Sequence, residues 1–520
     1  KIVAAWESKQ AKNATRFGGL GFLAVSLAAC NSSTDDTPAV PSTPAAPATP
    51  AVTALTQALA ATADVITSTF TSADDNITAV DTGTAATTTF GAGDVLVDSS
   101  STDNDTLTVT MSGAAGATVA APSTVTGIEN IIYNYDGIVT ATNSTVDAAN
   151  IIGANITVNH TGNAAVAPTG STVSNIGANN TVNFGTNIVG TAAAAVGASA
   201  TGVTINGGSA ATLDVDTGAS ADGVTINGGA SAALDVDLGA TNKNVTVTGG
   251  SAAGAEAVNV NSATGVSITT GAAVTGLDVT NVASNVSITY SVVGTSTAKG
   301  DIDVDGTAGT TDSATITAAG IHTLETRASA QVETLSLSGN GAAATYELNA
   351  TADLPTTLTF TGSQSVTFAV SEAQAAGLTT VTDSTTAGTT TIKVAALTAN
   401  RDLKALTSDV IDLNGAITGA VELIFKDGST VDITTAQTNA FEVDVDDGAT
   451  ADSTTGTLNV NVTKDITTLN VDSANDVVKT LNVVNSGSTN AAPHTYNVVD
   501  MAGTEAMTIN MSGTEANLAA

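Results

Sequence analysis

Gly-Val-Thr-Ile-Asn-Gly-Gly occupies residues 202–208 and recurs unchanged at residues 223–229, 21 residues later. Diverged copies follow at the same spacing, Asn-Val-Thr-Val-Thr-Gly-Gly at 244–250 and Gly-Val-Ser-Ile-Thr-Thr-Gly at 265–271. Apolar and polar residues alternate within each copy, which is typical of a β-strand with one buried face. A fixed period near 20 residues indicates a solenoid, because a single coil cannot bury its own apolar face and stacked coils can.

Each 21-residue copy contains two short strand patterns, such as 203–205 and 213–216, which recur at 224–226 and 234–237. Side chains alternate along a strand, so we expect Val, Ile and Leu to point inward and Thr, Asn and Asp to point outward. Glycine pairs between the patterns provide the turns. The sequence therefore predicts an all-β fold, a parallel β-solenoid of two-strand turns over residues 150–310.

The flanking regions carry similar strand patterns with less regular spacing. Residues 53–149 read as a mixed, mostly β region, with apolar spacings that predict a short helix around 52–67. Residues 311–520 read as a second β-rich module, either solenoid or sandwich, in which Thr-Leu-Asn-Val recurs at 457–460, 468–471 and 480–483.

Two local features stand out within this second module. Asp427-Gly428 lies between apolar runs and predicts a hairpin. Residues 371–378 predict one helical turn.

The amino-terminal residues 1–30 read as a signal or anchor segment. A basic lead is followed by a short apolar run that ends Leu-Ala-Ala-Cys at Cys30, which is similar to the lipobox of bacterial lipoproteins. Three interpretations remain open: a cleaved lipoprotein signal with lipidated Cys30, a retained anchor, and a chance match. Residues 31–52 form a linker rich in Pro, Thr and Ala, which we expect to be extended.

The charge of the chain is one-sided, with 48 acidic and 13 basic residues and a net charge of −35. No Lys or Arg lies between Arg16 and Lys243. Nucleic acid is a poor partner for such a surface, since phosphate binding requires cations. Divalent cations, salty water or a basic surface are suitable partners, and the charge also serves solubility. Cys30 is the only cysteine, so no intrachain disulfide can form.

The sequence offers little that could perform catalysis. The three histidines, His160, His322 and His494, are far apart with no metal-ligand spacing, and we expect them at turns or on the surface. Phosphate-binding loops and nucleophile elbows are absent from the sequence. A sugar-cleaving solenoid would need carboxylates paired with aromatics or cations, and both of these are scarce here. The sequence therefore predicts that the protein is not an enzyme.

Rows of aspartates are the best candidate binding residues. Asp214 and Asp216 recur one turn later as Asp235 and Asp237, so their carboxylates should stack at rung spacing and repel one another. Bound Ca²⁺ would relieve that repulsion, because it accepts several oxygen ligands. The alternative is a hydrated face that salt screens. Similar rows are Asp301, Asp303 and Asp305, and Asp444, Asp446 and Asp447.

The strand stretches 105–109, 125–131 and 331–337, together with the Thr-Leu-Asn-Val series, are similar to those of surface-layer proteins and large Thr-, Ala- and Asp-rich surface proteins of Gram-negative bacteria. The resemblance spans most of residues 100–520. It implies lattices of β-solenoid and β-sandwich modules that bind many Ca²⁺ ions. It also implies that an amino-terminal region anchors the protein to the outer membrane.

These observations lead to two functional hypotheses. The first is a non-enzymatic extracellular structural protein that assembles with itself into a surface layer, sheath or filament, stabilised by Ca²⁺. Its location would be the cell surface, against the outer membrane or its lipopolysaccharide. The second is an adhesin or a phage virion fibre that binds a receptor or glycan.

Overall fold

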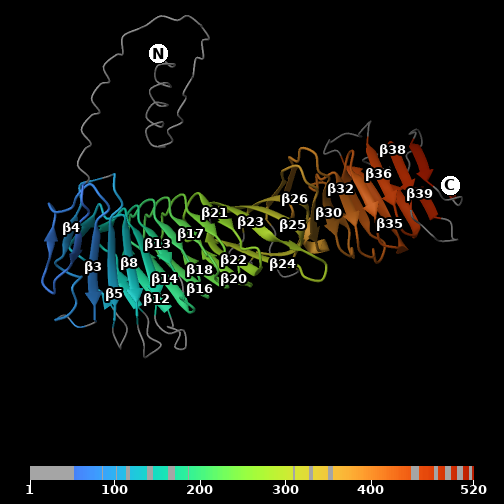
Figure 1. Cartoon of the computed structure of the whole chain (residues 1–520). Coiled ribbons are helices and arrows are strands. Elements are labelled where there is room, and N and C mark those ends of the chain that lie inside the picture. The colour runs from blue at the N-terminus through green and yellow to red at the C-terminus, as the bar shows by residue number, and fades with distance from the viewer. Residues whose placement is uncertain are drawn as a thin grey trace, which may run out of the picture. The chain divides into compact units, whose positions relative to one another are not determined.

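The computed structural model describes residues 52–519 apart from 83, 85, 101, 113–117, 137–143, 162–169, 186, 309–310, 327–331, 350–354, 447–455, 473–477, 487–493, 500–506 and 514–517. The predicted signal or anchor segment with Cys30, the linker up to residue 51, and Asp447 lie outside this part of the chain. Within it, the chain winds into a solenoid whose strands pair in parallel with those of the turns before and after (Figure 1).

One face of the solenoid, the first face, contains a strand from every turn over its amino-terminal two thirds. Its strands, in order, are β1 (Thr56–Ala58), β3 (Asn76–Asp81), β5 (Thr106–Met111), β8 (Asn130–Tyr135), β11 (Asn155–His160), β13 (Thr181–Phe184), β15 (Thr204–Asn206), β17 (Thr225–Asn227), β19 (Thr246–Thr248), β21 (Val266–Thr269), β23 (Asn285–Gly294), β25 (Ser313–Glu325), β26 (Thr334–Leu348), β27 (Thr357–Phe360) and β29 (Thr380–Asp383).

The second face runs beside the first and continues toward the carboxyl end. The long strands β25 and β26 take part in both faces. The remaining strands of the second face are β6 (Thr118–Val119), β9 (Ser144–Asp147), β12 (Gly170–Ile176), β14 (Thr191–Val196), β16 (Thr212–Thr217), β18 (Ala233–Asp237), β20 (Gly254–Asn259), β22 (Val274–Val282), β24 (Gly300–Gly306), β28 (Val366–Val370), β30 (Thr390–Val394), β32 (Val410–Leu413), β34 (Thr430–Ile433), β36 (Thr457–Val462), β38 (Thr480–Asn485) and β40 (Thr508–Gly513).

A third side closes each turn. In the first turns it is a small sheet of β2 (Val65–Ile66), β4 (Val95–Val97), β7 (Thr124–Thr126) and β10 (Ile151–Ile152). In the 21-residue repeats it narrows to single bridges that join Thr201, Asp222, Lys243 and Thr264 in successive turns. Near the carboxyl end a separate sheet contains β31 (Arg401–Asp402), β33 (Glu422–Lys426), β35 (Gln437–Asp446), β37 (Ile466–Asp472), β39 (His494–Val499) and β41 (Leu518–Ala519).

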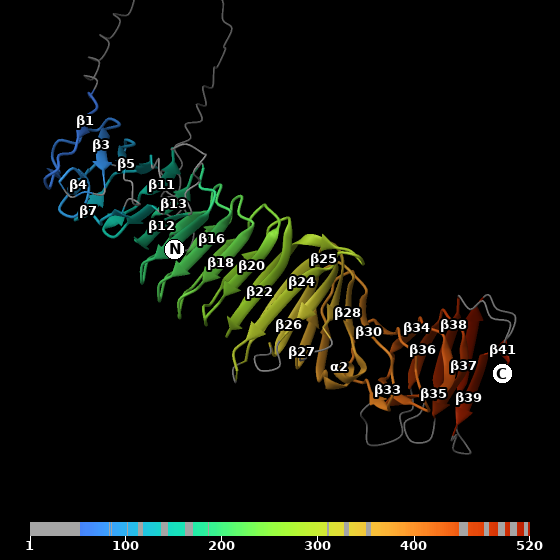
Figure 2. The ribbon, with the colours of Figure 1, turned by 90° about the horizontal axis from the view of Figure 1, so that it is seen from below.

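The predicted parallel β-solenoid is confirmed (Figure 2), and the register follows the repeat. Thr204 of β15 pairs with Thr225 of β17, and Asp214 of β16 pairs with Asp235 of β18. Most strands of residues 53–149 and 311–520 join the same parallel sheet as those of 150–310, and the others belong to the two smaller sheets. Across the described ranges, no helix is long and apolar enough to pass through a membrane.

Three local predictions had different outcomes. The predicted helix around 52–67 is wrong, since this stretch contains the short strands β1 and β2. The predicted hairpin at Asp427-Gly428 is also wrong, because β33 and β34 belong to different sheets and the Asp-Gly pair turns a corner between them. The helical turn is confirmed as α2 (Glu372–Gly377), which begins with a capping box between Ser371 and Gln374.

The core consists of inward side chains stacked from turn to turn. In the repeats Val203, Ile205, Leu213 and Val215 are fully buried, and the equivalent residues one turn later are at most 2% exposed. Each buried Val, Ile or Leu contributes about 1.5–3 kcal/mol of hydrophobic free energy. The scarce aromatic residues also serve the core, since the largest fully buried side chains include Tyr133, Tyr290, Tyr346, Phe184, Phe360 and Phe368.

The glycine pair of the repeat makes a corner that other residues cannot. Gly208 has a φ of +60°, and a Cβ on it would lie 1.4 Å from the carbonyl oxygen of Phe184 in the turn before. Gly229, its equivalent one turn later, has a φ of +65° and a Cβ position 2.6 Å from the amide nitrogen of Gly208. The repeat therefore requires glycine here for both backbone conformation and close approach.

Candidate functional site

A column of acidic side chains runs along the second face. Asp214 pairs with Asp235, which pairs with Ala257 in the next turn. Ala257 in turn pairs with Asp278, and Asp278 pairs with Asp303. The column ends at Glu325 of β25, the register partner of Asp303. This acidic column thus places five carboxylates at one position in six successive rungs, interrupted only at Ala257.

Two carboxylates of the acidic column, Asp214 and Asp235, have raised pKa values. The pKa of Asp214 is raised by partial burial and then by the negative charges of Asp216, Asp235 and Asp237. The pKa of Asp235 is raised by burial and by Asp237 and Asp216. Neighbouring rungs are about 4.8 Å apart, so each pair of unit charges repels by about 1 kcal/mol in water. A divalent cation beside the column would be attracted.

The row next to the acidic column changes from acid to amide. Asp216 pairs with Asp237, and Asp237 pairs with Asn259. The Asn259 amide donates a hydrogen bond of 2.9 Å to Asp237 Oδ1, and the Asn281 amide donates one of 2.9 Å to Asn259 Oδ1. In this row the Asp237 carboxylate accepts a hydrogen bond from the side chain of the next turn, where the acidic column would place another carboxylate.

Amide ladders recur on the solenoid. The Asn206 amide donates to Asn183 Oδ1 at 2.7 Å, and the Asn227 amide donates to Asn206 Oδ1 at 2.8 Å. Asn482 and Asn510 continue the same pattern from Asn459, at 2.8 Å each. Stacked asparagines form hydrogen bonds from turn to turn. They carry no charge and therefore do not repel one another, whereas stacked aspartates do.

Among the residues that the structure describes, carboxylates gather in threes at two places. In the first group, the Asp303 cluster, oxygens of Asp278, Asp303 and Asp305 lie within 4.8 Å of one another. Asp278 and Asp303 belong to the acidic column, and Asp305 is a buried residue two positions further along β24. Asp301, on the same strand, is exposed, and burial followed by the charge of Glu325 raises its pKa.

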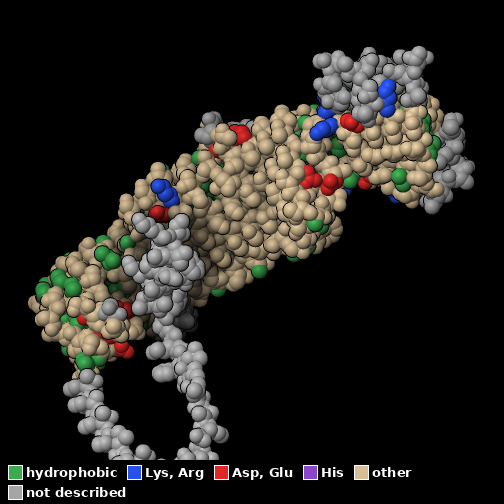
Figure 3. All heavy atoms as spheres, turned by 90° about the horizontal axis from the view of Figure 1, so that it is seen from above, with side chains coloured by type: hydrophobic (Ala, Val, Ile, Leu, Met, Phe, Trp, Pro, Cys, Tyr) green, Lys and Arg blue, Asp and Glu red, His purple; other side chains and the backbone are tan. Residues whose placement is uncertain are grey.

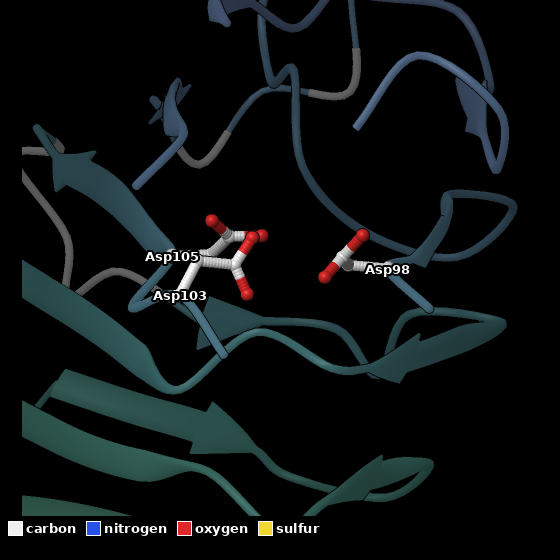
Figure 4. Close-up of side chains that lie close together, drawn as sticks. All are labelled: Asp98, Asp103 and Asp105. Atoms are coloured by element: carbon white, nitrogen blue, oxygen red, sulfur yellow. The ribbon is translucent and has the colours of Figure 1, made fainter. Parts of the chain in front are cut away.

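The second group, the Asp98 cluster, consists of Asp98, Asp103 and Asp105, whose carboxylate oxygens also lie within 4.8 Å of one another. Figure 4 shows the carboxylates of Asp103 and Asp105 together, facing that of Asp98. Asp98 follows β4 on the third side, and Asp105 precedes β5 on the first face. The cluster therefore closes the loop between these two strands.

Asp105 is held in place by a ladder of acidic residues at the corner before the first face. Asp105 Oδ1 accepts a hydrogen bond of 2.8 Å from the amide nitrogen of Asp75 in the preceding turn. The amide nitrogen of Asp105 donates to Glu129 Oε2 in the following turn, also at 2.8 Å. Asp75 accepts in the same way from the amide nitrogens of Leu55 and Thr71. The ladder therefore involves Oδ1 of Asp105, whereas its Oδ2 accepts no hydrogen bond.

Asp98 is fixed from two sides. Its amide nitrogen donates to the carbonyl oxygen of Thr126 at 3.0 Å, and its Oδ2 accepts from the amide nitrogen of Ser100 at 2.9 Å. Gly127, with a φ of +74°, passes so close that a Cβ on it would lie 2.3 Å from the Asp98 carbonyl oxygen. The backbone around the cluster is thus tightly constrained.

Two acids of the Asp98 cluster are buried, and the third, Asp103, is half-buried. Asp105 is 0% exposed and Asp98 is 8% exposed. Asp105 Oδ2 and both carboxylate oxygens of Asp103 are buried without a hydrogen-bond partner. Burial, together with the charges of Asp103, Asp75 and Asp98, raises the pKa of Asp105 to about 6, although the hydrogen bond from Asp75 opposes this. Burial and the charge of Asp103 also raise the pKa of Asp98.

The remaining predicted ligands are more scattered. Asp444 lies on β35 opposite Ile424 of β33, and Asp446 follows on the same strand. Asp214, Asp216, Asp235 and Asp237 stack in register as predicted but do not gather in a group of three. Asp303 and Asp305 do gather in a group of three, and its third member is Asp278, which is not among the ligands predicted from the sequence.

His160 and His322 occupy the core, which corrects the expectation that they lie at turns or on the surface. His160 is 3% exposed, and its Nε2 lies 2.7 Å from Ser171 Oγ, which in turn lies 2.7 Å from Ser144 Oγ. His322 is fully buried, with Nε2 2.8 Å from the Ala319 carbonyl oxygen and its ring against Tyr290. Burial lowers the pKa of His160 to about 4, so the ring is neutral. A neutral imidazole with hydroxyl and aromatic neighbours is compatible with the core.

The signal for the Asp98 cluster was present in the sequence, where three aspartates fall within eight residues, 98–105. The sequence could not show that the loop folds back to bring Asp98 against Asp103 and Asp105. Comparison with known proteins adds no relative: no protein-family model matches the chain, and no similar curated protein was found.

Proposed function

We propose that this chain is a non-enzymatic extracellular structural protein that assembles with itself into a surface layer, sheath or filament, with Ca²⁺ bridging its acidic surfaces. The observation that carries the proposal is the acidic column, in which Asp214, Asp235, Asp278, Asp303 and Glu325 present carboxylates at one register position of the second face. A surface repeated at rung spacing can meet an identical surface over many rungs at once, so weak contacts add up.

The outer surface supports this proposal by its uniformity. On the face shown in Figure 3, most side chains are neither hydrophobic nor charged, and acidic and basic groups are scattered. Outward Thr and Asn side chains repeat from β15 to β17, and outward Asp side chains repeat from β16 to β18. Such a face offers many equivalent polar contacts and no single deep anchor, which suits lattice or filament contacts better than recognition of one small ligand.

The net charge of −35 explains why assembly should depend on cations. Two chains with this charge repel one another unless ions intervene, and monovalent salt screens charges only beyond about 8 Å at physiological ionic strength. Ca²⁺ binds carboxylate oxygens from two partners directly, with six to eight ligands in flexible geometry. An acidic column on each of two neighbouring rods would supply such ligands.

Aromatic, histidine and serine side chains that a catalytic site could use are buried in the core, which supports a role other than catalysis. Phe184 and Tyr290, the aromatic residues of 150–310, are each 1% exposed and cannot stack on a sugar. His160 and Ser171 form a close pair, but both are at most 3% exposed and a substrate could not reach them. These aromatic, imidazole and hydroxyl side chains are used here to pack the solenoid.

The test is electron microscopy and light scattering of the purified chain, with millimolar CaCl₂ and then with excess EGTA. We expect ordered arrays or filaments with Ca²⁺ and their dispersal by EGTA. Arrays that EGTA leaves unchanged would contradict the bridging role of Ca²⁺. Single rods under every condition would contradict self-assembly and favour an adhesin or virion fibre.

A matched pair of variants tests the acidic column itself. D214N/D235N removes two carboxylates from the column, whereas D136N/D402N removes two exposed carboxylates elsewhere. We expect the column variant to require at least about threefold more Ca²⁺ for assembly, because it has lost two carboxylate ligands. We expect the control variant to assemble as the parent chain does. Equal behaviour of the two variants would exclude the column as the bridging surface.

A further inference from the structure

We infer that Asp98, Asp103 and Asp105 form an intramolecular Ca²⁺ site that joins the end of β4 to the start of β5. This site is separate from the acidic column and does not depend on the proposed assembly. It lies on the inner side of a loop, so its ion would serve the fold of one chain instead of a contact between chains.

The first argument is the set of oxygens left over by the fold. Asp105 is fully buried, and the corner ladder uses only its Oδ1, which accepts from the amide nitrogen of Asp75. Asp105 Oδ2 and both oxygens of Asp103 are buried with no hydrogen-bond donor, and they lie beside the carboxylate of Asp98. Buried carboxylate oxygens are nearly always paired or bound to a metal, because leaving them bare costs several kcal/mol.

A proton does not satisfy this cluster as well as a dication. One proton shared between Asp105 and a neighbour would occupy two oxygens and leave another buried oxygen bare. The three carboxylates lie within 4.8 Å of one another and Asp105 is fully buried, so three uncompensated negative charges are strongly disfavoured at this site. A dication cancels two of the three negative charges and contacts all three carboxylates at once.

The geometry favours Ca²⁺ over smaller or softer ions. All three donors are carboxylates, without His or Cys, which excludes the donor sets that Zn²⁺ prefers. The three carboxylates offer oxygens within 4.8 Å of one another, close enough to bind one ion, and the flexible coordination of Ca²⁺ suits donors fixed by the backbone of a turn. Ca²⁺ binds oxygen at about 2.3–2.6 Å, while Mg²⁺ needs about 2.1 Å and a strict octahedron.

The ion would clamp the loop of residues 98–105. Asp98 leaves the third side at the end of β4, and Asp105 enters the first face before β5. The Asp98 amide also binds Thr126 of the next turn, and Asp105 binds Asp75 of the preceding turn. Binding at this point therefore couples two sides of one turn and, through these hydrogen bonds, three successive turns.

Isothermal titration of the full, metal-stripped chain with CaCl₂ is the binding measurement. We expect D103N to weaken one class of sites at least about tenfold, because both of its buried oxygens are assigned to the ion. D136N, which removes an exposed carboxylate away from both clusters, should titrate as the parent chain does. D303N should alter the Asp303 cluster and leave the affinity assigned to the Asp98 cluster in place.

Local hydrogen exchange assigns the effect to this loop. We expect Ca²⁺ to slow exchange of peptides that cover residues 98–111 in the parent chain and in D303N, and to have no such effect in D103N. Without metal, D103N should exchange more slowly than the parent chain here, since it relieves repulsion between buried carboxylates. Without Ca²⁺ the parent chain should therefore exchange faster than D103N over these residues, and with Ca²⁺ it should exchange more slowly than D103N.

Three outcomes would overturn the inference. One is an unchanged titration in D103N, and another is Ca²⁺-induced protection of residues 98–111 that persists in D103N. The third is equal or stronger protection by Mg²⁺ at the same concentration, which would exclude assignment to Ca²⁺. Because each readout uses single chains in dilute solution, failure of assembly does not affect the result, and failure of this site leaves the assembly proposal untouched.

Discussion

Glu256 occupies the same inward position in its turn as Leu234 does in the turn before. The next residue in this stack is Leu277, so a carboxyl group lies between two leucines in the core. Glu256 is 4% exposed, and its Oε1 accepts hydrogen bonds from the amide nitrogens of Gly250 at 3.1 Å and Gly271 at 3.0 Å. These two donors explain how the core accepts an acid where its neighbours have leucine.

The first prediction concerns the pH dependence of stability at Glu256. Burial raises its pKa above that of the unfolded chain, although the two amide hydrogen bonds oppose this. The folded state therefore binds the proton more tightly, and the stabilisation is complete below the unfolded pKa and is lost as pH rises through the folded pKa. E256Q keeps the acceptor oxygen and removes this titration. We expect its melting temperature, relative to the parent chain, to rise between pH 4 and pH 8. A constant difference across this range would contradict the prediction.

The second prediction concerns the corner glycines of the repeat. G208A should destabilise the chain strongly, because its φ is +60° and the new Cβ would lie 1.4 Å from the Phe184 carbonyl oxygen. G341A is the matched control, with a φ of +68° and no atom within 4 Å of the Cβ position. The control should lose only the free energy of unfolding that a Cβ costs at a positive φ, about 1–2 kcal/mol. Thermal denaturation should show a clearly larger loss for G208A, and equal losses would mean that the corner relaxes freely.

The third prediction concerns the asparagine ladder on the first face. N206A removes the amide that donates to Asn183 and the oxygen that accepts from Asn227. We expect a loss of about 1–2 kcal/mol from these two hydrogen bonds. T204A, an outward substitution on the same strand, serves as the control for side-chain truncation. Chemical denaturation would contradict the ladder's contribution if N206A cost no more than T204A.

The fourth prediction concerns repulsion within the acidic column. D214N/D235N should raise the melting temperature at low salt in the absence of divalent ions, because it removes stacked like charges whose pKa values are already raised. The gain should shrink at about 1 M salt, where the screening length falls to about 3 Å. D136N/D402N removes the same number of negative charges from exposed positions elsewhere and should gain less. A gain that does not depend on salt would point to a cause other than repulsion.

Much of the fold follows from residue spacing alone. Alternating Val, Ile and Leu predicted which side chains face inward, and the 21-residue period predicted that Asp214 stacks on Asp235. These inferences succeed because strand alternation and identical turn length are local properties. The capping box at Ser371 was accessible for the same reason, since it involves residues three apart.

The acidic clusters required the tertiary structure. Asp278 and Asp303 share one register position although they are 25 residues apart, because the intervening turn is longer than the repeat. Their alignment with Asp214 and Asp235 depends on where the extra residues are accommodated, which the sequence does not state.

The sequence by itself determined the solenoid, its parallel rungs and its acidic surface, since these depend on periodicity and composition. Only the tertiary structure decided that Asp98 meets Asp103 and Asp105, that Glu256 replaces a leucine in the core, and that His160 and His322 are buried. The physical reason is that the direction of a side chain at a corner depends on backbone angles and on the adjacent turns. Neither of these can be read from residue order.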